Sequence, residues 1–130
     1  MSKIINNLWL GAYSEASNLK WLVRNNITHI LNMWTELDNC FPGKFTYKHV
    51  HAKDYESYNL KIHFDDIANW LEEALKTGRV FVHCYRGVSR STSAVCCYLM
   101  KKQNMDFQSA KNICKIKRPM AYPNSGFVRQ

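Results

Sequence analysis

Long hydrophobic runs are missing from the sequence, and this absence excludes a transmembrane helix. No window in the 130 residues approaches the roughly 18 consecutive apolar positions that such a helix needs. The first seven residues carry neither a long apolar stretch nor a small-residue cleavage site, so we expect a protein that is intracellular or has lost a leader. Repeats, low-complexity tracts and linkers rich in proline, glycine or serine are also missing. We therefore expect a single domain over residues 1–130.

Cysteine patterns typical of disulfides or metal sites are absent as well. The five cysteines are an odd number without C-x-x-C spacing, which predicts reduced thiols in a cytosol. We expect most of them, Cys84 excepted, to be small buried side chains. His49 and His51 are spaced as metal ligands, but no other ligand set joins them, so we expect neither a metal nor a cofactor. The expected location is the cytoplasm, extending to the nucleus.

The sequence does contain enough apolar material for a core, together with an excess of positive charge. Hydrophobic residues make up 46% and aromatic residues 13%, as in a folded globular domain. The net charge is +8, and most of it lies in residues 66–130, where eleven Lys and Arg stand against four Asp and Glu. Such a basic half suggests an anionic partner, whether phosphate, nucleic acid or a membrane surface, although a solvated basic face has the same composition.

Hydrophobic periodicity predicts strands and helices that alternate along the chain. The expected strands cover residues 4–10, 27–33, 45–51 and 80–82. The expected helices run from Ser14 toward Arg24, from Phe64 to Gly78, from Ser91 through Leu99, and from Asp106 to Pro119. Val23 should face inward, and Gly78 should end its helix as a left-handed cap. The strand 80–82, apolar throughout, should lie buried at the centre. This is an α/β fold, a central and mostly parallel sheet flanked by helices.

The segment between this buried strand and the next helix reads His83-Cys84-Tyr85-Arg86-Gly87-Val88-Ser89-Arg90-Ser91. A loop of this length can curl so that its backbone N–H groups point inward as an anion-binding nest, and the following helix adds its positive N-terminus. Gly87 permits a backbone angle that a side chain forbids, and Arg90 can bind two phosphoryl oxygens as a fork. The same positive field stabilises a nucleophilic Cys84 thiolate, to which Ser91 can donate a hydrogen bond. The segment is therefore a candidate phosphate-binding loop at the carboxyl end of a strand.

These motifs resemble the dual-specificity protein phosphatases, as a small atypical member of the cysteine-dependent protein tyrosine phosphatase superfamily. The resemblance covers nearly the whole chain and rests on NNLWLGAYSEASN at 6–18, ITHILN at 27–32, VFVHCYRGVSRSTSAVCCYLM at 80–100 and KRPMAYPNSGF at 117–127. It implies one catalytic domain without a kinase-docking domain, and a phosphatase-type phosphate-binding loop over 84–90. The chain stops at Gln130, just after the Gly-Phe element that leads into a last helix in relatives, so a trimmed C-terminus is among the expectations.

The resemblance also implies a two-step hydrolysis that needs no metal. Cys84 attacks the phosphorus in line and forms a phosphocysteine, while Arg90 and the loop amides hold the charge. Ser91 helps the sulfur leave when water releases phosphate. Asp54, in a polar loop 30 residues before Cys84, matches the family's general acid. The other aspartates fit less well, Asp38 because it lies in an earlier loop and Asp65 and Asp66 because they fall on a rigid helix.

Several further residues have expected supporting roles. His83 should point away from the nucleophile, because strand neighbours alternate faces, and should orient the loop by hydrogen bonds. Asn124 should brace the loop. Arg86 either favours acidic substrates or is a solvated charge, and Cys96 or Cys97 could trap an oxidised Cys84. The basic cluster of Lys115, Lys117 and Arg118 is expected on an exposed edge.

Three functions stay open. The first is a monomeric protein phosphatase acting on phosphotyrosine and phosphoserine or phosphothreonine, with phosphorylated proteins as partners. The second is the same chemistry on phosphoinositides or RNA 5′-phosphates, which the loop disfavours because it lacks the extra lysines of lipid-directed relatives; a nucleic-acid partner is not expected. The third is a non-catalytic phosphate binder, disfavoured because cysteine, arginine and acid are all present. Rhodanese-like sulfur transfer also uses a loop cysteine, but Arg90, Ser91 and Asp54 argue against it.

Overall fold

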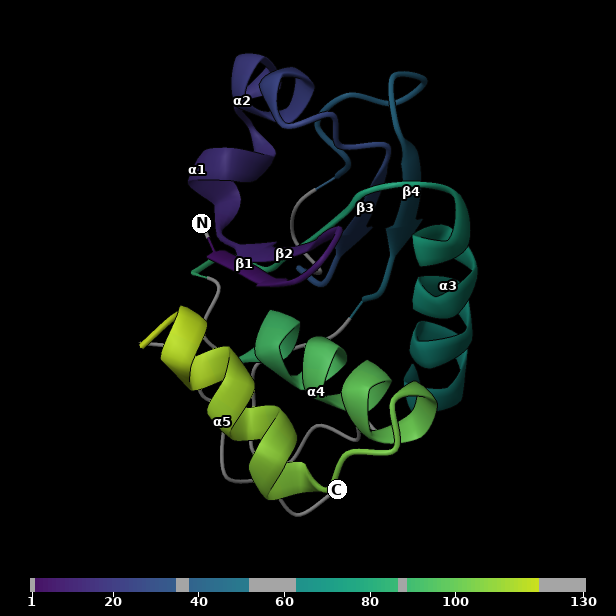
Figure 1. Ribbon diagram of the computed structural model, residues 1–130. Coiled ribbons are helices and arrows are strands. Elements are labelled where there is room, and N and C mark those ends of the chain that lie inside the picture. Colours follow the sequence, from purple (N-terminus) through teal and green to yellow (C-terminus); the bar gives the residue numbers. More distant parts are fainter. Residues whose placement is uncertain (1, 35–37, 52–62, 87–88, 120–130) are drawn as a thin grey trace.

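A five-stranded sheet lies at the centre of the protein (Figure 1). The structure, a computed structural model, describes residues 2–34, 38–51, 63–86 and 89–119. The strands are β1 (Ser2–Ile5), β2 (Leu8–Gly11), β3 (His29–Asn32), β4 (Thr46–His49) and β5 (Val80–His83). Their order is β1-β2-β5-β3-β4; β1 and β2 are antiparallel, and the other neighbours are parallel. The predicted mostly parallel sheet is therefore confirmed.

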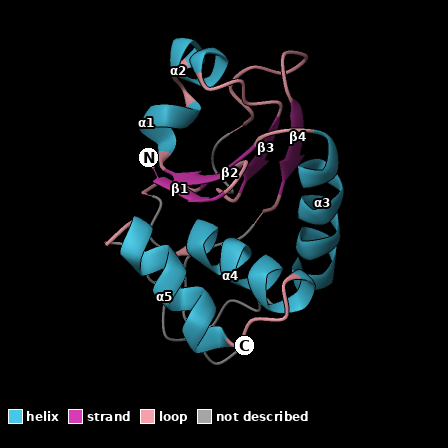
Figure 2. Ribbon diagram, in the orientation of Figure 1, coloured by secondary structure: helices cyan, strands magenta, loops and turns pink. Residues whose placement is uncertain are grey.

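Helices cover both faces of this sheet (Figure 2). One face carries α3 (Phe64–Thr77), α4 (Arg90–Lys102) and α5 (Phe107–Lys117). The other face carries two short helices, α1 (Tyr13–Ala16) and α2 (Leu19–Arg24). In the part of the chain that the structure describes, no helix combines the length and the apolar character needed to cross a bilayer.

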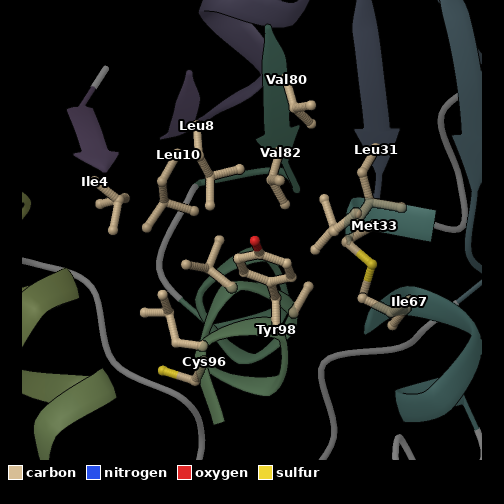
Figure 3. Close-up of a cluster of buried hydrophobic side chains, with 14 of the residues drawn as sticks. Ile4, Leu8, Leu10, Leu31, Met33, Ile67, Val80, Val82, Cys96 and Tyr98 are labelled. Carbon is tan, nitrogen blue, oxygen red and sulfur yellow. The ribbon is translucent and has the colours of Figure 1, made fainter. Parts of the chain in front are cut away.

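The larger core lies between the sheet and α4. The β5 residues Val80, Phe81 and Val82 are fully buried, as predicted for a central strand. Figure 3 shows the ring of Tyr98 on α4 pointing toward the sheet, below Val82. Every residue of α4 from its first position to Leu99 is buried, because α3 and α5 pack on either side of it. The helix that follows the candidate loop is thus held firmly in the interior.

The N-terminal segment forms a hairpin instead of the single strand predicted over 4–10. Asn6 and Asn7 make the turn between β1 and β2, and Asn7 has a φ of 68°. Asparagine tolerates this left-handed conformation because its short polar side chain can bond locally. The turn lets β1 fold back along β2 and leaves β2 to pair with β5.

The predicted helix over 14–24 is likewise divided in two. The side chain of Asn18 accepts a hydrogen bond from the Trp21 N–H at 3.1 Å and so caps the start of α2. The break rotates α2 relative to the predicted helix. Leu22 consequently takes the buried position, and Val23, expected inside, is 60% exposed. By contrast Asp106 caps α5 as predicted, accepting from the Ser109 N–H at 2.8 Å.

Gly78 ends α3 in an extended conformation, with φ −156°, and the predicted left-handed cap is wrong. A Cβ at this position would collide with the Thr28 hydroxyl and lie 2.9 Å from the His29 ring. Thr28 is itself held, because its hydroxyl accepts from the Arg79 N–H. Glycine is required here by the close approach of the α3–β5 turn to the start of β3.

We expect Gly78→Ala to lower the free energy of unfolding by about 1–3 kcal/mol, because the added methyl group overpacks a contact that cannot relax freely. Thr77→Ala, at the exposed neighbouring position, is the matched control. Urea unfolding of the three proteins measures the difference. Equal stabilities for Gly78→Ala and the wild type would contradict the close-approach explanation.

Candidate active site

Four parallel strands end in register at one edge of the sheet. Gly11 of β2 pairs with His83 of β5, His83 pairs with Asn32 of β3, and Asn32 pairs with His49 of β4. The ladder continues one step further, since the Met33 N–H donates to the His83 carbonyl at 2.8 Å. Ligands of parallel sheets bind beyond such carboxyl ends. The loop after the central strand therefore starts at the position where a site is expected.

Cys84 is the first residue after β5 and turns toward the helix layer of α3, α4 and α5. It is 3% exposed and packs in the core on that side. Its Sγ lies 3.2 Å from the Oγ of Ser91, the second residue of α4, which is fully buried. A hydroxyl can donate to a thiolate. The contact predicted from the sequence between this thiol and this hydroxyl is thus present in the structure.

Arg90 begins α4 beside this pair. Ser89 precedes it as the N-cap residue, and the Ser89 carbonyl accepts from both the backbone N–H and the hydroxyl of Ser93 at 2.9 Å. Arg90 is only 8% exposed. A guanidinium keeps its charge at any physiological pH, and the helix start adds a positive field. Arg90 and the first turn of α4 therefore bring positive charge to the start of the helix that also carries Ser91, the partner of Cys84, and this suits an anionic ligand.

The first part of the loop is tied to two other segments by its backbone. The Tyr85 carbonyl accepts from the Tyr13 N–H at 3.0 Å, and the Arg86 carbonyl accepts from Nη2 of Arg118 at 3.2 Å. The side chains of Tyr85 and Arg86 are exposed. Gly87 and Val88 lie outside the described residues, as do the predicted general acid Asp54 and the predicted brace Asn124. The roles of these four residues stay predictions.

Arg118 is a residue whose role the sequence reasoning missed. It was expected on an exposed edge with Lys115 and Lys117, yet it is 8% exposed and donates to the loop, whereas the two lysines are exposed. Its spacing contains the clue, because Arg118 follows the buried Cys114 by four residues, on the face of α5 that also buries Ala110. A cation that continues an apolar helical stripe is directed inward.

His83 lies on the sheet face opposite Cys84, as strand alternation predicts. Its ring stacks on Phe81 with centroids 5.6 Å apart, and its Nδ1 is 3.4 Å from the Cys84 carbonyl oxygen. Burial lowers the pKa of His83 to about 4, although the hydrogen bond to that carbonyl acts in the opposite direction. The imidazole is therefore neutral near pH 7, and its contact is with the backbone of Cys84.

The other candidate thiols and ligands have partners of their own. The Cys97 thiol donates to the Phe64 carbonyl at 3.2 Å, and a hydrogen bond to Cys114 lowers the pKa of Cys96. The rings of His49 and His51 lie 4.1 Å apart, and within the described ranges no group of three or more His, Cys, Asp or Glu side chains could hold a metal ion. Trapping of an oxidised Cys84 by Cys96 or Cys97 stays a prediction.

The pKa of His83 predicts a specific loss of stability in acid. The ordinary value is 6.5 and the folded value is about 4, so between these limits the unfolded chain binds more protons than the folded one. The free energy of unfolding therefore decreases as the pH falls from 6.5 to 4, by about 3 kcal/mol at roughly 1.4 kcal/mol per pKa unit. His83→Gln should flatten this pH dependence, whereas His51→Gln, at an exposed position, should preserve it. Urea unfolding between pH 4 and 7 measures both; an unchanged slope in His83→Gln would contradict the assignment.

We expect Arg118→Met to weaken binding of inorganic phosphate to the loop by about tenfold, because a hydrogen bond from a charged donor is worth about 1.5–3 kcal/mol and only part of it acts through the loop. Lys117→Met removes the same charge from the exposed neighbouring position and should leave the affinity within about twofold. Isothermal titration calorimetry with phosphate compares the two. Equal losses in both variants would indicate a general charge effect and not a brace.

Comparison with known proteins assigns the chain to a family. The family model described as "Dual specificity phosphatase, catalytic domain" matches residues 8–130. The chain is 37% identical to the Arabidopsis thaliana "Dual specificity protein phosphatase 1B" over 131 residues, covering 100% of this chain and 78% of that one. It is 43% identical over 130 residues to the Mus musculus "Protein phosphatase Slingshot homolog 3", of which it spans 20% while 99% of this chain is covered.

Solved structures agree. The crystal structure of DUSP15 superposes with a TM-score of 0.93 at 32% identity, covering 99% of this chain and 83% of that one. The human tyrosine phosphatase-like serine/threonine/tyrosine-interacting protein superposes with a TM-score of 0.94 at 29% identity, covering 99% and 91%. The match to the family model includes the buried Cys84–Ser91 pair at the end of the central strand. The chain therefore belongs to the dual-specificity phosphatase family, and residues 8–130 form its cysteine-dependent catalytic domain.

Proposed function

We propose that this domain hydrolyses phosphotyrosine and phosphoserine or phosphothreonine in protein substrates, through a phosphocysteine formed on Cys84. The observation that carries the proposal is the 3.2 Å contact between the Cys84 Sγ and the Ser91 Oγ, at the point where β5 ends and α4 begins. One structural relative is described as phosphatase-like, so catalysis is argued from this site and not from the fold.

In the first step the Cys84 thiolate attacks the phosphorus in line. The sulfur–phosphorus bond forms as the bond from phosphorus to the substrate oxygen breaks. Arg90 and the backbone N–H groups of the loop stabilise the charge on the non-bridging oxygens. Asp54 gives its proton to the leaving oxygen, so tyrosine, serine or threonine departs neutral.

In the second step water attacks the phosphocysteine. Asp54, now a carboxylate, takes a proton from the water, and the bond between sulfur and phosphorus breaks. The Ser91 hydroxyl donates to the departing sulfur, whose negative charge would otherwise be unfavourable in a buried position. Inorganic phosphate leaves, and Cys84 returns to the thiolate form.

The distribution of charge favours protein substrates over polyanionic ones. Part of the basic half is paired within the fold, since Lys101 contacts Asp65 at 2.8 Å and Lys102 contacts Glu72 at 3.6 Å. These pairs between α4 and α3 reduce the positive surface that a phosphoinositide or an RNA 5′-end would need. Among the described residues, Arg86 is an exposed positive charge two positions after Cys84, which suits a phosphorylated side chain with a modest negative neighbourhood.

The test is phosphate release, in the presence of a chelator, from a peptide phosphorylated on both threonine and tyrosine. We expect the wild type to release phosphate from both residues and Cys84→Ser to release none. Asp54→Asn should be slower by about 10²–10⁴-fold, the range for a lost general acid. Asp38→Asn, another loop aspartate, is the matched control and should retain activity.

Three outcomes would change the proposal. Release from tyrosine alone would narrow the substrate class to phosphotyrosine. Activity that survives in Cys84→Ser would remove Cys84 as the nucleophile. An inactive wild type on peptides that hydrolyses a phosphoinositide or an RNA 5′-phosphate would replace the protein substrate with that class.

A further inference from the structure

Three aromatic residues occupy equivalent positions beyond three neighbouring strands. Tyr13, Tyr85 and Trp34 each lie two residues after the strand ends at Gly11, His83 and Asn32. Those three strand ends are paired in register across β2, β5 and β3. Residues at equal distances beyond aligned parallel strands start from the same height above the sheet edge. The sheet therefore brings together three rings that are far apart in the sequence.

The three rings form one continuous cluster. Trp34 and Tyr85 stack with centroids 4.8 Å apart and planes at 24°, and Tyr13 meets Trp34 edge-on at 5.6 Å and 72°. The cluster is not closed off from solvent, since Tyr85 is 53% exposed, Tyr13 is 38% exposed and Trp34 is half-buried. Large aromatic side chains gathered at an exposed site, and not in the core, are typical of a recognition surface.

The backbone beneath the cluster is held in place. The Trp34 N–H donates to Oδ1 of Asn32 at 2.9 Å, and the Trp34 carbonyl accepts from Nε2 of His49 at 2.8 Å. The Tyr13 N–H donates to the Tyr85 carbonyl at 3.0 Å. None of these bonds uses the ring of Tyr13, Trp34 or Tyr85, so the three rings are presented by a preformed frame. A preformed surface binds with a smaller entropic cost than one that must order on binding.

The cluster borders the candidate nucleophile. Cys84 lies between His83 and Tyr85, and it turns toward α4 while His83 and the aromatic cluster belong to the opposite side of the sheet edge. A phosphorylated side chain that reaches Cys84 enters the loop, and the residues flanking it stay at the rim. The rim on the side of α1 is formed by Tyr13, Trp34 and Tyr85.

The charge around the cluster disfavours a basic side chain, and the exposed ring surface favours an apolar one. Arg86 is exposed directly after Tyr85, Arg118 donates to its carbonyl, and the whole chain has a net charge of +8. A lysine or arginine on the substrate would meet this positive charge, although aromatic faces alone would attract it. An apolar side chain gains from burial against the rings without that repulsion.

We infer that Tyr13, Trp34 and Tyr85 form a specificity surface that binds an apolar side chain adjacent to the phosphorylated residue of a protein substrate. The inference rests on the proposed protein phosphatase function and names a feature of its substrates. The three residues take no part in bond making or breaking. They act through binding, so their contribution should depend on the residue next to the phosphate and not on the phosphate itself.

The experiment compares three phosphotyrosine peptides that differ only in the residue after phosphotyrosine, which is leucine, alanine or lysine. For the wild type we expect kcat/KM to be about tenfold higher for the leucine peptide than for the alanine peptide, and lowest for the lysine peptide. Trp34→Ala and Tyr85→Ala should reduce the leucine preference to within about twofold, and Trp34→Phe should restore part of it. Val23→Ala, an exposed apolar position on α2, is the matched control and should keep the full preference.

Two further measurements distinguish the loss of the specificity surface from damage to the phosphate-binding loop. Orthovanadate fills the phosphate loop and has no side chain, so its inhibition constant should be the same for Trp34→Ala and the wild type within about twofold. Affinities of the same peptides for Cys84→Ser, with and without Trp34→Ala, test the preference without any hydrolysis. An inactive wild type would overturn the proposed function, while these affinities would still decide the specificity surface.

The inferred role of the specificity surface is wrong if the leucine preference persists in both Trp34→Ala and Tyr85→Ala. It is also wrong if Trp34→Phe or Trp34→Ala weakens orthovanadate and all three peptides equally, since that would show damage to the loop. A third contrary result is a Trp34-dependent affinity for a 5′-phosphorylated oligonucleotide together with none for the peptides, which would assign the rings to base stacking.

Discussion

The alignment of four strand ends around β5 is the constraint on which the site depends. Gly11, His83, Asn32 and His49 are paired in register, so every segment that leaves the sheet at this edge begins at a fixed height. The alignment persists because β5 is central, fully buried and hydrogen-bonded on both sides. A shift of one residue would move each of its apolar side chains to the other face of the sheet, where the core is packed around a different side chain. Such a shift would therefore lower the stability of the fold. The sheet thus sets the positions of the candidate nucleophile Cys84, its neighbours and the aromatic rim.

Successive side chains at this edge point alternately to the two faces of the sheet. Cys84 and Met33, one residue beyond the strand ends, turn into the core shared with α3, α4 and α5. That direction brings the thiol to the first turn of α4, where Ser91 and Arg90 are. His83 and Tyr85, one residue to either side of the thiol, belong to the opposite side with Phe81 and Trp34. The candidate catalytic residues and the proposed specificity surface therefore lie on opposite faces of one backbone.

Polar groups outside the loop hold it by its backbone. Neutral His83 contacts the Cys84 carbonyl, and Arg118 donates to the Arg86 carbonyl. The Tyr13 N–H satisfies the Tyr85 carbonyl between them. Three successive carbonyls thus have donors outside the loop, which orients their peptide units and leaves the opposite side of the backbone free to present N–H groups to an anion. These contacts give a physical reason for a fixed backbone shape in the described part of the candidate phosphate-binding loop.

The sequence by itself determined the α/β class, the central position of β5 and the loop with Cys84, Arg90 and Ser91, because these follow from local patterns: an apolar run, turn residues, and a helix start. It also placed the cap at Asp106, which involves residues only three apart. Tertiary structure alone decided which strand β2 pairs with, the extended end of α3 at Gly78 and the group to which Arg118 donates. Each of these depends on a segment distant in the sequence, respectively β5, Thr28 and the Arg86 carbonyl. Local periodicity contains no record of such partners, so only the folded chain shows them.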